Sequence, residues 1–318
     1  MKLEDIGFYT LSDARARTAN EKSPLQRCEL ILTDKCNFHC PYCRGVKSEY
    51  SGTISQSDAL NTLAFWLDEG LKNVRFSGGE PTLYTHLVEL VSYCKGNGVE
   101  RVAVSTNGSA SKETYRELLD AGVNDFSVSL DACCASTADI MSGTKGMYNK
   151  VLDNIRFLAG ETYTTVGIVL TERNVQETTK IVRTAQSLGV SDIRVISAAQ
   201  WNIYVHLTGT GLLNQFPIFK YRRKNLILGR NMRGIKDTDT NKCPLVLDDM
   251  AVVGGYHFPC IIYLREGGNP IGKVSKLMRE DRKKWFDVHN THKDEICRKN
   301  CLDVCCDYNN KWVSYHAS

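Results

Sequence analysis

The sequence predicts an α/β protein built on a parallel sheet. Between residues 28 and 200, short runs rich in β-branched and apolar residues alternate with longer runs whose apolar residues recur about every 3.6 positions. Strands that alternate with helices are joined by crossovers and therefore lie parallel. An open doubly wound sheet and a partial barrel share this alternation, so the pattern alone does not separate the two.

Six strands and five helices are expected from this alternation. Glycines follow four of the helices, at Gly70, Gly98, Gly122 and Gly189, where a helix end favours a left-handed residue. The expected strands span 29–33, 73–76, 101–105, 125–130, 164–170 and 192–196, and the expected helices span 55–69, 83–96, 111–121, 147–158 and 175–188.

Length and composition exclude several classes of protein. The chain has 318 residues, which suggests about two domains. With 42% hydrophobic and 24% charged residues, it is not a disordered, collagenous or coiled-coil chain. No apolar run approaches the ~20 residues of a membrane helix, and the first residues are too polar for a signal peptide. We therefore expect a cytoplasmic protein with no membrane partner. The net charge of +4 does not argue for a nucleic-acid partner.

Cysteine is unusually abundant, at 13 residues. In a reducing compartment such cysteines more often bind metals or act in catalysis than form disulfides, and an odd number argues against a closed disulfide framework. Three lie close together near the start, at Cys36, Cys40 and Cys43. Six more lie in the last quarter of the chain: Cys243, Cys260, Cys297, Cys301, Cys305 and Cys306.

The organisation along the chain predicts four parts. They are an N-terminal extension (1–27), the α/β core (28–200), a basic linker (201–242) and a small cysteine-rich domain (243–318) with few helix signals. The linker carries seven positive charges between Lys220 and Lys236. We interpret it either as a solvated face or as a cradle for an anionic substrate group, since arginine forks suit phosphate and carboxylate.

The strongest motif is the C-x3-C-x2-C run of Cys36, Cys40 and Cys43, directly after the first expected strand. Three thiolates on one loop can hold three irons of a [4Fe–4S] cluster and leave the fourth iron without a protein ligand. A structural zinc site usually has four ligands in pairs. His39 lies inside the loop, where its geometry as a fourth ligand is poor.

Together with three further segments, this run resembles the radical S-adenosylmethionine (SAM) superfamily, in particular its MoaA-like and PqqE-like members. The other segments are Phe76–Pro81, Ser105–Gly108 and Ser127–Asp131, each at the end of an expected strand. The resemblance implies a partial (β/α)6 TIM-like barrel. It also implies a [4Fe–4S] cluster on Cys36, Cys40 and Cys43, bound SAM, and an external one-electron donor such as flavodoxin or ferredoxin.

The resemblance also implies which residues contact SAM. Gly78 and Gly79 let the backbone approach the methionine moiety closely. The carboxylate of Glu80 suits the ammonium group, and Pro81 begins the next helix. The remaining candidates follow other strands or flank the adenine: Ser105, Asn107, Ser129, Tyr42 and Ile196.

The C-terminal cysteines resemble a SPASM or twitch domain, whose opening G-x4-C form is matched by Gly255–Cys260. Six cysteines suffice for one auxiliary [4Fe–4S] cluster but not for two. The expected ligands are Cys243, Cys260, Cys297 and Cys301, with Cys305 as the substitute. A closed zinc site of the same cysteines is the alternative.

The expected activity is reductive cleavage of SAM to a 5′-deoxyadenosyl radical, which removes a hydrogen atom from a small anionic metabolite such as a sugar or nucleotide. The outcome is dehydrogenation or epimerisation. An epimerase requires a hydrogen-atom donor, and the candidate thiols are Cys133, Cys134 and Cys306.

The two alternatives to this activity are a peptide-modifying maturase and a non-catalytic iron–sulfur protein. A peptide-modifying maturase is disfavoured, since 27 residues before the first strand are too few for a leader-binding domain. GTP cyclisation is not expected, because Lys311–Ser318 lacks the glycine–arginine tail of the molybdenum-cofactor enzyme. The alternative from another class is a non-catalytic iron–sulfur electron-transfer protein.

Overall fold

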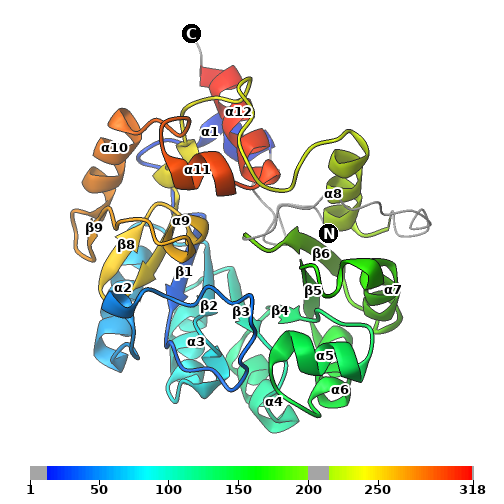
Figure 1. Cartoon of the computed structure of the whole chain (residues 1–318). Helices are drawn as coiled ribbons and strands as arrows, with labels where there is room; N and C mark the ends of the chain where they lie inside the picture. The colour runs from blue at the N-terminus through cyan, green and yellow to red at the C-terminus, as the bar shows by residue number, and fades with distance from the viewer. Residues whose placement is uncertain (1–12, 200–214, 317–318) are drawn as a thin grey trace. The chain divides into compact units, whose positions relative to one another are not determined.

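A computed structural model describes residues 13–199 and 215–316 (Figure 1). The first part of the expected extension and residues 201–214 of the expected linker lie outside the described residues. The sequence-based boundaries, which place all of 28–200 in one core, stay a prediction. By its contacts the chain forms two compact units: Met1–Lys35, Arg44–Val102 and Arg233–Ser318 make the first, and Cys36–Cys43 and Ala103–Met232 make the second.

The sheet of the second unit is parallel throughout. It contains most of β3 (Arg101–Thr106), then β4 (Asp125–Ser129), β5 (Tyr163–Leu170) and β6 (Asp192–Ser197), each paired with the next. Its helices are α4 (Lys112–Ala121), α5 (Ala135–Ser142), α6 (Tyr148–Glu161), α7 (Thr178–Ser187) and α8 (Pro217–Ile227).

The two faces of this sheet differ in polarity, because successive side chains of a strand point to opposite sides. One face is apolar and fully buried, as at Phe126 and Val128, and Tyr115 of α4 packs edge-on against Phe126 with ring centroids 5.7 Å apart. The opposite face carries Ser127, Ser129 and Arg194, of which Ser129 is exposed and Arg194 half-buried. The second face is therefore the one available to a polar ligand.

The sheet of the first unit mixes parallel and antiparallel pairing. Its strand β1 (Arg27–Ile31) lies between β2 (Asn73–Ser77) and β7 (Asp249–Val253), parallel to both. The sheet continues antiparallel through β8 (Tyr256–Phe258) to β9 (Gly272–Lys273). Ile31, Ala251, Phe258 and Leu264 pack together as a buried cluster against it.

The helices of the first unit include four in the cysteine-rich region, although the sequence there shows few helix signals. Their apolar residues are too sparse for a clear 3.6-residue pattern, since α10 reads MREDRKKWFDV. The helices are α1 (Asp13–Thr18), α2 (Gln56–Asp68), α3 (Leu87–Gly96), α9 (Ile261–Arg265), α10 (Met278–Val288), α11 (Glu295–Asn300) and α12 (Asp303–His316).

The predicted parallel α/β fold is confirmed, and all six expected strands are present. Among the described residues, β6 pairs with β5 alone and β9 with β8 alone, so neither unit's sheet is a closed barrel. Among the described residues, no helix combines the length and the apolar composition that a membrane crossing requires.

Candidate functional site

The three-cysteine loop follows β1 and lies in the second unit. Cys36 and Cys43 are exposed and Cys40 is half-buried, and all three are free thiols. The loop turns tightly, since the Cys43 N–H donates to the Cys40 carbonyl at 3.0 Å and the Phe38 N–H donates to the Cys36 sulfur at 3.4 Å. Three thiols on one short, accessible loop are the donor set that suits three irons of a [4Fe–4S] cluster.

Asparagine side chains hold the start of the loop. The Asn37 amide donates to the Ser109 hydroxyl at 2.8 Å. The Asn107 amide donates to Asn37 Oδ1 at 2.8 Å and lies 3.8 Å from the Cys36 sulfur. Asn107, a predicted SAM contact, is therefore also a neighbour of the first cysteine in this structure.

The middle of the loop packs against the end of α5. The His39 N–H donates to the Ser142 carbonyl at 2.8 Å. Gly143 has a φ of 63°, and a Cβ there would lie 2.4 Å from the His39 carbonyl oxygen. Only glycine tolerates both this left-handed conformation and this close approach. The loop and α5 are therefore in backbone contact.

The end of the loop is fixed by Tyr42, whose phenol donates to the carboxylate of Asp131. Burial, and then the charge of Asp131, raises the pKa of Tyr42 well above its usual range, so the phenol stays the donor. Burial raises the pKa of Asp131 to about 6. Asp131 was not among the expected site residues, although it ends the Ser127–Asp131 segment.

The turn after β2, Gly78–Pro81, lies in the first unit and is hydrogen-bonded to the segment that leads into the cysteine loop. The Gly79 N–H donates to the Thr33 carbonyl at 2.7 Å, and the Glu80 N–H donates to the Lys35 carbonyl at 2.8 Å. A Cβ on Gly79 would lie 2.2 Å from the Lys35 carbonyl oxygen. The turn is therefore fixed against the residues that directly precede Cys36.

The carboxylate of Glu80 is almost fully buried and caps the short helix η4 (Pro81–Leu83). Glu80 Oε1 accepts the Thr82 N–H at 3.1 Å and the Thr82 hydroxyl at 2.7 Å. Pro81 occupies the start of that helix, as expected. The hydrogen bonds from Thr82 thus fix the orientation of the Glu80 carboxylate.

Arg265 of α9 ties the far end of the loop to the same turn. Its guanidinium donates to the Gly45 carbonyl at 2.8 Å and to the Gly78 carbonyl at 2.9 Å. Gly45 lies two residues beyond Cys43. The neighbouring residues Arg44 and Glu266 form an ion pair. No sequence pattern marked Arg265, which lies 220 positions from Gly45.

Three further predicted SAM contacts share the polar face of the second unit's sheet. The pairing places Ser105 beside Ser127, and Ser129 beside Gly167. Ile196 lies two residues beyond Arg194 on β6, and so on the same face. The structure adds Arg194 to this face, where its guanidinium donates to the Ser127 hydroxyl. The contact of these residues with SAM stays a prediction.

The C-terminal cysteines gather in the first unit. Cys243 begins the short helix η7 (Pro244–Leu247), Cys260 begins α9, Cys297 lies on α11, and Cys305 lies on α12. Burial, and then the charges of Cys260 and Cys305, raises the pKa of Cys243. Burial raises that of Cys260 to about 12, and Cys305 contributes.

Cys243, Cys260 and Cys305 lie close enough together for one thiol to affect the pKa of another. Cys297 interacts electrostatically with Cys243 and Cys260, whereas Cys301 interacts with Cys305 and Cys306. A cationic iron–sulfur core would bind these free, partly buried cysteines as thiolates and neutralise their charge. His289 and Asp294 lie beside Cys297, with ligand atoms within 4.8 Å of one another, so a mixed zinc site of this region remains an alternative.

The candidate hydrogen-atom donors have different surroundings. Cys306 is buried, and its sulfur lies 4.0 Å from the Gly234 carbonyl. Cys133 and Cys134 lie between β4 and α5, near Glu177. The hydroxyls of Ser136 and Thr137 lower the pKa of Cys134 to about 7. Burial, and then the neighbouring Glu177, raises that of Cys133 to about 11.

Two arginines of the basic stretch are structural. Arg222 of α8 is 2% exposed and donates to the Met232 carbonyl at 3.5 Å. Arg233 is 3% exposed and donates to the Asn300 carbonyl at 3.4 Å. Neither a solvated face nor an open anion cradle describes these two residues, because both side chains are buried.

Comparison with known proteins identifies relatives of the α/β region. The family described as "Radical SAM superfamily" matches residues 30–185. A protein of Saccharolobus solfataricus named "Probable GTP 3',8-cyclase" is 31% identical over 193 residues, 60% of each chain. One of the same name from Metallosphaera sedula is 28% identical over 177 residues, 54% of this chain and 56% of that protein. The chain thus matches about 60% of the length of these relatives.

Two solved structures share the fold. SuiB of Streptococcus suis bound to S-adenosylmethionine has a TM-score of 0.59 at 15% identity, over 84% of this chain and 66% of that one. The protein anSMEcpe with bound AdoMet and a peptide has a TM-score of 0.56 at 15% identity, over 92% of this chain and 96% of that one. At this identity the likeness concerns the fold alone.

Proposed function

Residues 30–185 form a radical SAM domain, and from this premise we propose that the chain cleaves SAM reductively and removes a hydrogen atom from a small anionic molecule. The cofactors of this domain are a [4Fe–4S] cluster and SAM. When bound, the reduced cluster would supply one electron to the sulfonium of SAM, which would break into methionine and a 5′-deoxyadenosyl radical. The protein contributes binding and orientation.

The three-cysteine loop carries this proposal. Cys36, Cys40 and Cys43 would hold three irons and leave the fourth open for SAM, and Lys35 and Gly45 on either side of the loop are hydrogen-bonded within one unit. The residues that flank the loop are thus held by hydrogen bonds, and such support favours a preorganised site.

The turn Gly78–Pro81 would receive the methionine moiety of SAM. Its glycines leave the backbone bare, and Glu80 presents a carboxylate fixed by Thr82. Ser105, Ser129 and Ile196, on the polar face of β3, β4 and β6, would contact the remainder of the molecule. Tyr42 and Asn107 would act closer to the cysteines, since their partners are Asp131 and Asn37.

A second cluster would bind the C-terminal cysteines. Cys243, Cys260 and Cys297 interact with one another, and Cys305 interacts with the first two, so Cys305 is as well placed as Cys301 for the fourth ligand. An auxiliary cluster of this kind would accept the electron that a dehydrogenation releases. A flavodoxin or ferredoxin would supply the electron that starts the reaction.

An anionic substrate is supported by Arg194, a half-buried cation on the polar face of the sheet. A guanidinium already oriented by Ser127 suits phosphate or carboxylate. A nucleotide is one member of this class and fits the name of the relatives from Saccharolobus and Metallosphaera. A peptide substrate is the second candidate, because anSMEcpe was solved with a peptide on the same fold.

The proposal is tested by anaerobic incubation of the reconstituted chain with SAM and dithionite, followed by quantification of 5′-deoxyadenosine. We expect formation by the unaltered chain and none by the Cys36→Ala/Cys40→Ala/Cys43→Ala variant. The same amount from both would contradict the proposal and would favour a non-catalytic electron-transfer protein.

The substrate class is tested in the same assay by adding GTP, other nucleotides, sugar phosphates or peptides. Stimulation by an anionic small molecule, lost in Arg194→Gln, supports the proposed class, whereas stimulation by peptides alone supports the second candidate. In heavy water, an epimerised product carries deuterium, and a dehydrogenated product is two hydrogens lighter.

A further inference from the structure

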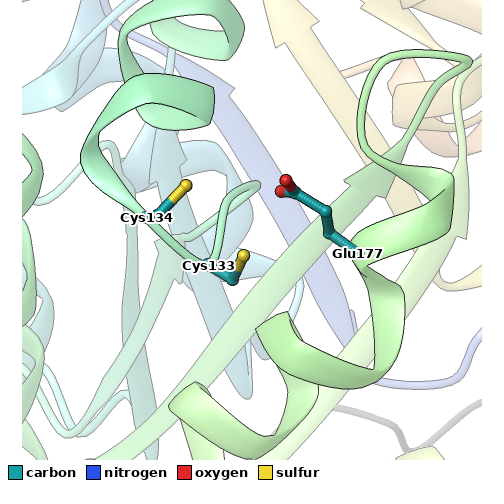
Figure 2. Close-up of side chains that lie close together, drawn as sticks. All are labelled: Cys133, Cys134 and Glu177. Carbon is teal, nitrogen blue, oxygen red and sulfur yellow. The ribbon is translucent and has the colours of Figure 1, made fainter.

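Two consecutive cysteines, considered so far only as hydrogen-atom donors, converge with a glutamate at one end of the second unit's sheet. Cys133 and Cys134 lie between β4 and α5, and Glu177 ends the short helix η5 (Val175–Glu177) after β5. Figure 2 shows both sulfurs and the carboxylate turned toward one another from these two segments. One ligand atom from each residue lies within 4.8 Å of the other two.

The carboxylate is held by one oxygen and leaves the other without a hydrogen bond. Glu177 Oε1 accepts the Thr137 hydroxyl at 3.0 Å. Glu177 Oε2 is shielded from solvent and accepts no hydrogen bond from the described residues. A buried carboxylate oxygen without a partner is costly, and a cation would satisfy it.

The thiol of Cys134 is oriented by hydroxyl groups of α5. Its sulfur lies 3.3 Å from the Ser136 hydroxyl and 3.4 Å from the Thr137 hydroxyl. Thr137 therefore contacts both Cys134 and Glu177, and it fixes these two donors relative to each other. The arrangement resembles the outer partners that orient the ligands of metal sites.

We propose that Cys133, Cys134 and Glu177 bind a zinc-like divalent cation. Two thiolates and one carboxylate form a donor set for zinc and not for magnesium or calcium, which prefer oxygen ligands alone. With bonds of about 2.3 Å, two sulfurs of a tetrahedral site lie about 3.8 Å apart. The three ligand atoms lie within 4.8 Å of one another, at most about 1 Å more than this sulfur–sulfur distance, so only small movements are needed.

The bound cation would join two loops that the chain does not otherwise link covalently. It would cross-link the segment after β4 to the segment after β5, and a fourth position would stay open to water. A thiolate bound to a cation has no S–H hydrogen. While the site is filled, Cys133 and Cys134 are therefore excluded as hydrogen-atom donors to the substrate, and Cys306 remains.

The experiment uses the full chain with its clusters reconstituted anaerobically. One equivalent of Zn²⁺ is added, loosely bound metal is removed by desalting, and zinc and iron are measured by mass spectrometry. We expect one zinc per chain in the unaltered protein and none in the Cys133→Ser/Cys134→Ser variant. Glu177→Gln, which preserves size, should weaken zinc binding at least about tenfold in a chelator competition.

Two controls separate this site from the cluster cysteines. Glu172→Gln removes an exposed carboxylate of the neighbouring turn and should leave zinc binding unchanged. The Cys36→Ala/Cys40→Ala/Cys43→Ala variant should lose iron but keep its zinc. Equal iron in the Cys133, Cys134 and Glu177 variants shows that they fold. Equal zinc in those variants, no zinc in the unaltered chain, or loss of zinc with the cluster loop would each overturn the proposal.

Discussion

Tyr42 donates its phenolic hydrogen to Asp131, a residue 89 positions later in the chain. Asp131 in turn accepts the Val169 N–H at 2.5 Å, and its carbonyl accepts the Asn174 side chain at 2.9 Å. One carboxylate therefore connects the cysteine loop to the end of β5. The loop that would hold the cluster thus depends on contacts beyond its own sequence.

Replacing Tyr42 by Phe should destabilise the chain and loosen the cluster. A hydrogen bond to a charged group contributes about 1.5–3 kcal/mol, and its loss leaves the half-buried Asp131 short of a donor. We expect a lower midpoint of thermal unfolding and faster loss of iron to a chelator. Tyr84→Phe is the matched control, because the buried Tyr84 hydroxyl has no hydrogen-bond partner among the described residues. Equal iron loss in both variants would count against the role of Asp131.

Replacing Gly79 by Ala should abolish most SAM cleavage. The new methyl group would meet the Lys35 carbonyl oxygen at 2.2 Å and the Asp34 carbonyl oxygen at 2.6 Å, and both are backbone atoms next to Cys36. The turn must shift, and we expect at least about a tenfold loss of 5′-deoxyadenosine formation. Gly96→Ala, where a Cβ meets nothing within 4 Å, should be neutral or slightly stabilising. Full activity in Gly79→Ala would refute this account of the turn.

Replacing Cys243 by Ser should remove one cluster and spare the other. The thiol neighbours Cys260 and Cys305, so its loss breaks the auxiliary donor set. We expect iron to fall by about four atoms per chain, with 5′-deoxyadenosine formation retained. Cys306→Ser, which removes a buried thiol outside the expected ligands, should leave the iron content unchanged. An unchanged iron content in Cys243→Ser would instead indicate that these cysteines hold no cluster.

Replacing Asp192 by Asn should change how stability depends on pH. Asp192 is fully buried and accepts the Ile218 N–H of α8 at 2.9 Å. Burial raises its pKa to about 6. Between about pH 4 and 6 the folded chain keeps a proton that the unfolded chain has lost, so the contribution of Asp192 to stability falls as pH rises.

Asn does not titrate, so its contribution to the stability of the folded chain does not fall as pH rises. The unfolding midpoint of Asp192→Asn minus that of the unaltered chain should therefore rise from about pH 4.5 to 6.5. Asp153→Asn, at an exposed carboxylate, should show no such trend. A flat or falling difference for Asp192→Asn would contradict the assignment.

Local signals explain why the α/β elements could be predicted from the sequence. For α4, the Ser111 hydroxyl accepts the Thr114 N–H at 3.1 Å, and Gly122 ends the helix with a φ of 111°. Both residues are recognisable in the sequence. The cysteine spacing is equally local, because Cys36, Cys40 and Cys43 lie on one loop. Such features require no knowledge of the rest of the chain.

Features that depend on distant partners could not be predicted. β7 is a short apolar run whose place beside β1 follows only from the folded sheet. Glu177 lies 40 positions from Thr137, and no periodicity connects it to the cysteines. Arg265 reaches Gly78 from 187 positions away. In each case the signal is a contact made by folding and not a pattern of neighbouring residues.

The pairing of β1 with β7 joins Cys28 to Met250, which lie more than two hundred positions apart. Contacts of such long sequence separation slow folding, because closing the long intervening loop costs entropy before the contact forms. During synthesis, β1 and the cysteine loop after it leave the ribosome long before β7 exists. The first unit, which holds the C-terminal cysteines, is therefore completed only after residues 233–318 have been made, and loading of an auxiliary cluster should follow their synthesis.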